Sequence, residues 1–121
     1  MTPKEIDEKR ASLAAKYGFE RCAAPEDAKV GIARNIKSDQ LPINGVRCLP
    51  EEGTTGWYIW AGETMSDSAE FFVPLHVSHL AEWLPHVLPY LELPPGWRFL
   101  VAPGHEEVWF DPEVDLSPTV G

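Results

Sequence analysis

The stretch from Gly56 to Glu63 constrains the fold of this 121-residue chain more than any other. It reads Gly-Trp-Tyr-Ile-Trp-Ala-Gly-Glu, and such a run of aromatic, β-branched and small residues without proline is typical of a well-covered strand. Strand alternation divides its side chains between two faces: Trp57, Ile59 and Ala61 on one, Tyr58 and Trp60 on the other. Because both faces carry large apolar groups, we expect a central strand with each face covered, by helices or by something outside the chain.

The remaining segments predict an α+β fold in one domain, residues 1–121. A capping-box pattern at Thr2 to Glu5 predicts an N-terminal helix within residues 1–18 that ends at Gly18. We expect a single antiparallel sheet of about five strands, with a short helical insertion before a C-terminal hairpin. The expected elements are strands at 29–36, 46–49 and 56–63, one or two helices from Leu75 with Ser78 as N-cap, strands at 97–102 and 106–110, and a loose tail at 112–121.

Charge is distributed unevenly along the chain. Residues 1–50 carry nine Lys and Arg against seven Asp and Glu, whereas residues 51–121 carry one base, Arg98, against twelve acids. The halves are therefore +2 and −11, which gives the net charge of −9. An acidic surface argues against binding nucleic acid, since phosphates must be met by cations. It favours a cationic partner, although acidic surfaces also serve solubility alone.

The location and the cysteines are inferred from equally simple features. The first sixteen residues lack the apolar run of a signal peptide, and no window is apolar enough for a membrane span. We therefore expect a soluble cytoplasmic protein that does not bind membranes. Cys22 and Cys48 belong to no motif, and we expect them to be reduced thiols of the core.

The sequence contains no convincing catalytic or cofactor motif. His76, His79 and His86 with Glu82 could form a metal site, because a spacing of three places two imidazoles on one helical face. Structural or solvated histidines are the better interpretation, since the leucines of this segment already pack. The glycines fit neither nucleotide-binding pattern, and no serine or cysteine stands in a nucleophile motif. We expect no enzyme activity, no cofactor and no metal.

A recognition surface is the remaining possibility. The acidic stretch that begins at Glu63 and contains Asp67 and Glu70 follows directly on the tryptophan-rich strand. Aromatic side chains supply rigid contact area, and adjacent acids supply steering and specificity. We therefore predict a partner-binding site formed by two tryptophans and three acids: Trp57, Trp60, Glu63, Asp67 and Glu70.

Part of the sequence also resembles a known protein family. Gly56-Trp57 with Gly62-Glu63, followed by Pro85, Tyr90-Leu91 and a Pro95-Gly96 turn into Phe99, resembles the Imm33-like family of bacterial immunity proteins. The likeness covers roughly residues 30–100. It implies a non-enzymatic protein that binds and neutralises a toxin delivered between competing bacteria, and it implies no catalytic residues. Tyr58, Trp60 and the helix before residue 30 depart from the family's pattern.

Two other functions stay open at this point. A small metal-dependent hydrolase would use His76, His79 and Glu82 in a deep polar pocket. A structural module would instead use an apolar sheet face as a homodimer interface. The first hypothesis is an immunity protein, either a monomer or a homodimer, whose partner is a protein toxin with a cationic surface.

Overall fold

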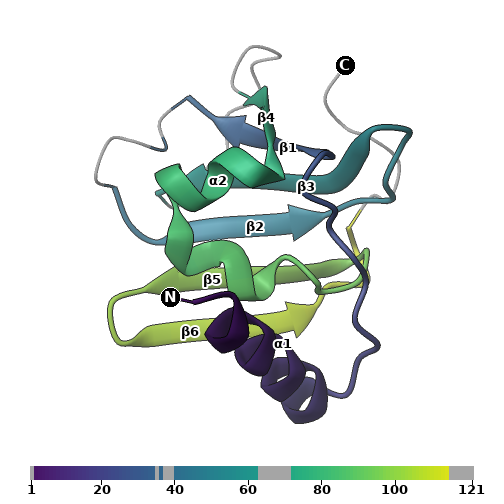
Figure 1. Cartoon of the computed structure of the whole chain (residues 1–121). Helices are drawn as coiled ribbons and strands as arrows, with labels where there is room; N and C mark the ends of the chain where they lie inside the picture. Colours follow the sequence, from purple (N-terminus) through teal and green to yellow (C-terminus); the bar gives the residue numbers. More distant parts are fainter. Residues whose placement is uncertain (1, 35, 37–39, 63–71, 115–121) are drawn as a thin grey trace.

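A computed structural model describes residues 2–34, 36, 40–62 and 72–114 of the chain (Figure 1). Within these residues one sheet is accompanied by two α-helices and one 3₁₀ helix. The expected α+β class, the N-terminal helix, the helical insertion and the C-terminal hairpin are confirmed. The elements in chain order are α1 (Pro3–Tyr17), β1 (Lys29–Ala33), β2 (Ile43–Arg47), β3 (Thr54–Ala61), β4 (Phe72–His76), α2 (Val77–Trp83), η1 (Pro85–Tyr90), β5 (Trp97–Ala102) and β6 (His105–Phe110).

The sheet has six strands in the order β4-β1-β3-β2-β5-β6. Strand β3, which contains the tryptophan-rich stretch, lies in the interior as expected. The sheet is mixed, because β1 runs parallel to β3 while the other neighbours are antiparallel. The expectation of a purely antiparallel meander is therefore wrong at one pair. The β2–β3 hairpin inserts β3 between β1 and β2, so that two strands adjacent in sequence are not adjacent in space.

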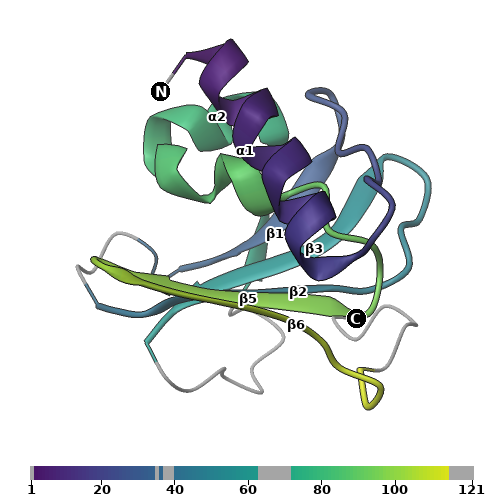
Figure 2. The ribbon, with the colours of Figure 1, turned by 90° about the horizontal axis from the view of Figure 1, so that it is seen from below.

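All three helical elements lie on one face of the sheet (Figure 2). The strand residues that alternate onto this helical face form the core with them. Burial of such apolar side chains stabilises a domain by about 1.5–3 kcal/mol for each large residue. The most deeply buried members are Val30, Ile32, Trp57, Ile59, Leu80, Val87, Leu91 and Phe99.

Local sequence signals set the ends of α1. The Thr2 hydroxyl accepts a hydrogen bond from the Glu5 backbone N–H at 3.1 Å, which satisfies one of the free N–H groups of the first turn. Pro3 occupies the first turn, where its missing N–H costs nothing. The helix ends at Gly18, whose φ of 73° lies in the left-handed region that favours glycine. The predicted caps of this helix are confirmed.

The segment after residue 71 differs from the prediction. Residues Phe72–His76 form β4, an edge strand, where helical spacing was expected to begin at Leu75. The α2 helix begins at Val77, so the expected N-cap Ser78 lies inside it. Instead of a side-chain cap, the Val77 and Ser78 N–H groups donate to the carbonyls of Ala28 and Glu26. Tertiary contacts with the chain before β1 therefore replace the local capping signal.

The Arg47 side chain connects four parts of the fold. It is 1 % exposed, and its guanidinium donates hydrogen bonds of 2.8–3.0 Å to five backbone carbonyls. Burial lowers its pKa, yet arginine stays charged at any physiological pH. The five acceptors belong to Cys22, Ala23, Thr55, Leu91 and Leu93. One cation thus ties β2 to β3, to the segment after α1 and to the turn before β5.

The Trp57 indole supports the same junction. Its Nε1 donates to the Leu91 carbonyl at 2.8 Å, and its ring lies 5.7 Å from the Arg47 guanidinium carbon. Leu91 therefore accepts from both side chains. A buried tryptophan of this kind satisfies its single donor while contributing a large apolar surface to the core.

We expect Arg47→Met to destabilise the protein by more than about 3 kcal/mol, because buried carbonyls lose charged donors that each contribute about 1.5–3 kcal/mol. The stability of Arg47→Lys should lie between those of Arg47→Met and the wild type, since an ammonium has three donors but lacks the planar guanidinium geometry. Urea unfolding followed by circular dichroism measures both changes. Lys4→Met on exposed α1 is the control. An Arg47→Met variant within about 1 kcal/mol of the wild type would contradict this role.

Candidate functional site

Two of the five predicted site residues are described by the structure, and both of them are buried. Trp57 and Trp60 are 1 % and 4 % exposed, so both indoles are core residues. Trp57 faces the helices, and Trp60 faces the other side of the sheet, where its ring packs edge-on against Phe72. Buried indoles offer no surface to a partner, which corrects the expectation that these two side chains make the contact. Glu63, Asp67 and Glu70 lie outside the described residues.

Arg98 organises the sheet face opposite the helices. Its guanidinium carbon lies 5.9 Å from the Trp60 ring and 5.5 Å from the Trp109 ring, both within cation–π range. Its Nη1 also contacts the Asp111 carboxylate at 3.1 Å. Arg98, the one basic residue in the sequence from 51 to 121, therefore makes its contacts within the fold, with two tryptophans and an acid.

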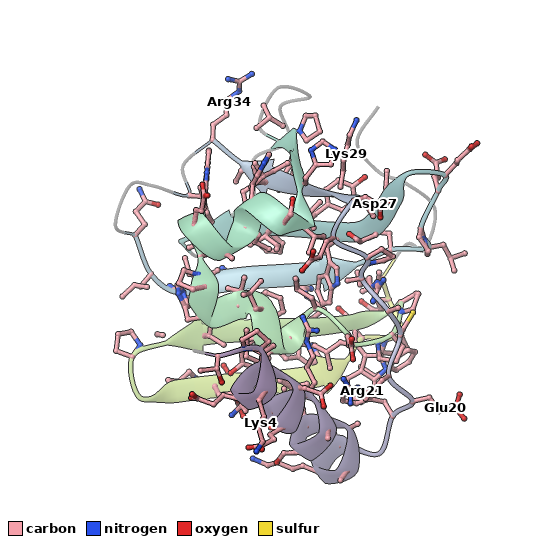
Figure 3. The ribbon with its side chains drawn as sticks, viewed as in Figure 1. Lys4, Glu20, Arg21, Asp27, Lys29 and Arg34 are labelled. Carbon is pink, nitrogen blue, oxygen red and sulfur yellow. The ribbon has the colours of Figure 1, made fainter. Side chains whose placement is uncertain are left out.

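A small part of the charge asymmetry is balanced by α1 and the segment that follows it. Arg10 and Arg21 both contact Glu92, at 3.4 and 2.6 Å, and Arg21 also contacts Asp7 at 2.6 Å. Figure 3 shows Arg21 beside α1, on the connection that leaves the helix. These pairs fasten the basic half of the sequence to the acidic half, so part of the acidic excess serves the fold.

Other acids stay exposed and unpaired. Within the described part of the chain, nine exposed acids contact no lysine or arginine: Glu5, Glu8, Glu20, Glu26, Asp27, Glu51, Glu52, Glu82 and Glu113. Glu107 contacts only His105, at 3.1 Å, and both side chains are largely exposed. Among the described residues Glu107 therefore has no lysine or arginine partner. These acids are the part of the charge that is available to a partner.

Exposed aromatic residues accompany Glu107 on strand β6. Trp109 is 36 % and Phe110 is 54 % exposed, and they project to opposite faces of the sheet. We call Glu107, Trp109 and Phe110 the β6 rim, since β6 forms one edge of the sheet. The Phe110 ring packs on Trp97 and against Gly96, whose φ of 93° and missing side chain leave room for it. The rim therefore combines an acid with aromatic surface held in place by the hairpin.

A cleft of about 670 Å³ lies beside the start of β6. Its walls come from α1, η1 and the β5–β6 hairpin, and they include Lys9, His86, Tyr90, His105 and Glu106. The Glu106 carboxylate accepts a short hydrogen bond from the Tyr90 hydroxyl and contacts Lys9 Nζ at 3.1 Å. An acid, a phenol and an ammonium thus converge at this position.

A family model for the Imm33-like domain matches residues 9–111, which include every strand, α2, η1 and most of α1. The chain belongs to the Imm33-like family. No curated protein and no solved structure matches it. The family's name is that of immunity proteins, so the resemblance found at Gly56-Trp57, Gly62-Glu63 and Tyr90-Leu91 is confirmed at the level of the family.

In this Imm33-like protein the pKa values of Glu106 and Tyr90 are both shifted away from neutral pH. Burial would raise the pKa of Glu106, but hydrogen bonds from Tyr90 and Lys9 outweigh it, and the pKa is lowered. Burial, together with the hydrogen bond to Glu106, raises the pKa of Tyr90 far above its usual value. A general acid or base needs a pKa near the working pH. The Tyr90–Glu106–Lys9 cluster is therefore suited to hold α1 and η1 on β6.

The histidines of the Imm33-like protein are divided between two places. His76 and His79 pack edge to face with ring centroids 5.7 Å apart, whereas His86 lies in the cleft wall. Partial burial lowers the pKa of His86. Among residues 2–34, 36, 40–62 and 72–114 no three His, Cys, Asp or Glu side chains converge as metal ligands. Cys22 and Cys48 are free thiols, the second of them buried.

Sequence reasoning missed the β6 rim and the Tyr90–Glu106–Lys9 cluster. The sequence does mark Trp109 and Phe110 as strand residues, but strand order alone determines that they lie at an edge. The cluster joins residues far apart in the sequence and has no motif. In the described part of the Imm33-like protein, no helix is both long and apolar enough to cross a membrane.

We expect Glu106→Gln to destabilise the protein by about 1–2 kcal/mol at pH 7, because charged hydrogen bonds are replaced by neutral ones in a partly exposed site. A carboxyl with a lowered pKa stabilises the fold above its unfolded pKa of 4.5, and that contribution is lost as the pH falls further. The difference between wild type and variant should therefore shrink below pH 4.5.

Urea unfolding at several pH values tests this expectation. Glu107→Gln is the matched control, since Glu107 is a largely exposed neighbour paired only with His105. Glu107→Gln should change the free energy of unfolding by less than about 0.5 kcal/mol at every pH tested. A Glu106→Gln difference that stays constant from pH 7 to pH 3.5 would show that the Glu106 charge does not stabilise the fold.

Proposed function

We propose that this Imm33-like protein is a non-enzymatic immunity protein that binds a protein toxin and blocks it. The observation that carries the proposal is the family match over residues 9–111. The cleft chemistry supports it, since the converging acid and phenol of Glu106 and Tyr90 are tuned away from proton transfer at neutral pH. Binding, rather than a reaction, is then the means of protection.

The charge of the molecule supports a toxin with a cationic surface. The net charge is −9, and the acids that remain unpaired add to a negative field that attracts cations over a distance. Complementary charge accelerates association and suppresses wrong partners. Toxins that attack nucleic acid need cationic clefts for the phosphates. An acidic inhibitor can occupy such a cleft in their place, and we propose this class of toxin.

Two surfaces are candidates for the contact. The β6 rim offers exposed aromatic area, which is enriched at protein interfaces, beside Glu107, whose charge can steer a cationic partner. The second candidate is the sequence-based one, the acids Glu63, Asp67 and Glu70. We place the principal contact at the β6 rim, and the three acids remain a prediction that is tested beside it.

We expect Glu107→Lys to weaken binding to the cognate toxin domain by about tenfold or more, because a favourable charge contact becomes repulsive. Glu82→Lys is the matched control. It changes the net charge by the same amount at an exposed acid on α2, so it should reduce affinity only through the general field. Surface plasmon resonance at two salt concentrations separates the local effect from the general one.

A triple variant, Glu63→Ala, Asp67→Ala and Glu70→Ala, tests the other surface in the same assay. If this variant loses affinity and Glu107→Lys does not, the principal contact lies at the sequence-based site. If the toxin does not bind the wild-type protein, and co-expression does not protect cells from it, the proposed function is wrong for this pair.

A further inference from the structure

The two edges of the sheet differ in their capacity to pair with another strand. Strand β4 contains Pro74, which lacks a backbone N–H and is typical of an edge protected against pairing. Strand β6 contains no proline over its six residues. Figure 2 shows β6 at the rim of the sheet in the foreground and α1 above the plane of the sheet, while Figure 1 shows the end of α1 passing beyond β6 in front of that plane. Among the described residues, β6 pairs only with β5, so its outer edge has no strand beside it there.

The ladder with β5 fixes which backbone groups of β6 point outward. The Asp111 N–H donates to the Gly96 carbonyl at 2.9 Å, and the strands pair Phe110 with Trp97 next to it. In an antiparallel pair, hydrogen-bonded and non-bonded residues alternate. His105, Glu107 and Trp109 therefore bond to β5.

The alternate residues Glu106, Val108 and Phe110 direct their N–H and C=O groups away from the sheet, and no described residue bonds to those groups. Three donors and three acceptors thus stand in a row along the edge. An extended segment that pairs with them gains backbone hydrogen bonds at a spacing that no globular surface matches by chance.

We propose that an extended segment of the protein partner adds to the sheet as a seventh strand beside β6. This inference rests on the proposed function, and it specifies the partner's chemistry: a strand that alternates Lys or Arg with apolar residues. Its basic side chains lie on the side of Glu107 and Trp109. There they can pair with the Glu107 carboxylate and make a cation–π contact with the exposed part of the Trp109 ring. Its apolar side chains lie beside Val108 and Phe110.

Charge decides between a toxin segment and a second copy of the chain. Two copies that met at β6 would each bring a net charge of −9 and the exposed acid Glu107 to the same edge. Acidic edge residues are one means by which proteins prevent pairing with their own kind. The same residues attract a basic strand. The β6 edge is therefore selective for a cationic partner.

Phe110→Pro and Phe110→Ala form a matched pair for the test. Both remove the aromatic ring, and only proline also removes the outward N–H and blocks an incoming strand. The ladder to β5 is preserved, since the Phe110 N–H does not point toward β5. We expect Phe110→Pro to bind the cognate toxin domain about tenfold more weakly than Phe110→Ala. Equal affinities for two folded variants would overturn strand addition.

Hydrogen exchange on the wild-type complex gives a second readout that does not depend on any variant. The amides of Glu106, Val108 and Phe110 should exchange at least about tenfold more slowly in the complex than in the free protein, and those of β4 should not change. If the toxin binds and these three amides stay unprotected, the inference is wrong while the proposed function stands. If the toxin does not bind the wild-type protein, the inference and the proposed function are both wrong. If these amides become more protected as the concentration of the free protein is raised, the β6 edge pairs with a second copy of the chain instead.

Discussion

The fold depends on one buried cation. Arg47 lies at the end of β2, 1 % exposed, and donates hydrogen bonds to five backbone carbonyls. A buried charge is costly unless it is fully hydrogen-bonded, so the surrounding carbonyls must stay where they are. Because the acceptors come from the connection after α1 and from the turn before β5, α1 and the C-terminal hairpin are positioned through this side chain. The β6 rim inherits its position from that junction.

Local sequence signals predicted the elements whose causes are local. Thr2 and Gly18 delimit α1 through a side-chain cap and a left-handed residue, both readable from a few adjacent positions. The Gly56 to Glu63 stretch predicted an interior strand because two faces of large apolar groups require two covered faces. The features that sequence reasoning missed are set at a distance. The parallel pairing of β1 with β3, the start of α2 on Ala28 and Glu26, and the Arg47 junction all join residues with no common motif.

The candidate site shows the same division. Composition singled out aromatic residues and acids, but it could not assign them to a face or an edge. Trp57 and Trp60 were chosen because they neighbour the acidic stretch, yet adjacency in an interior strand means burial. Trp109 and Phe110 belong to the last strand of the sheet, where one side has no neighbour. Strand order thus decides which aromatic residues reach solvent, and strand order depends on contacts that no single segment encodes.

The acidic excess has two distinct uses in this protein. Glu92, Glu106 and Asp111 are paired with cations of the same chain, and their charges hold α1 and the hairpin on the sheet. The cations they neutralise are then lost to the surface, which leaves the unpaired acids as the charges that a partner meets. A large negative field therefore persists although many acids are internally balanced. Near an open strand edge such a field repels a second copy and attracts a basic strand, so solubility and selectivity follow from the same residues.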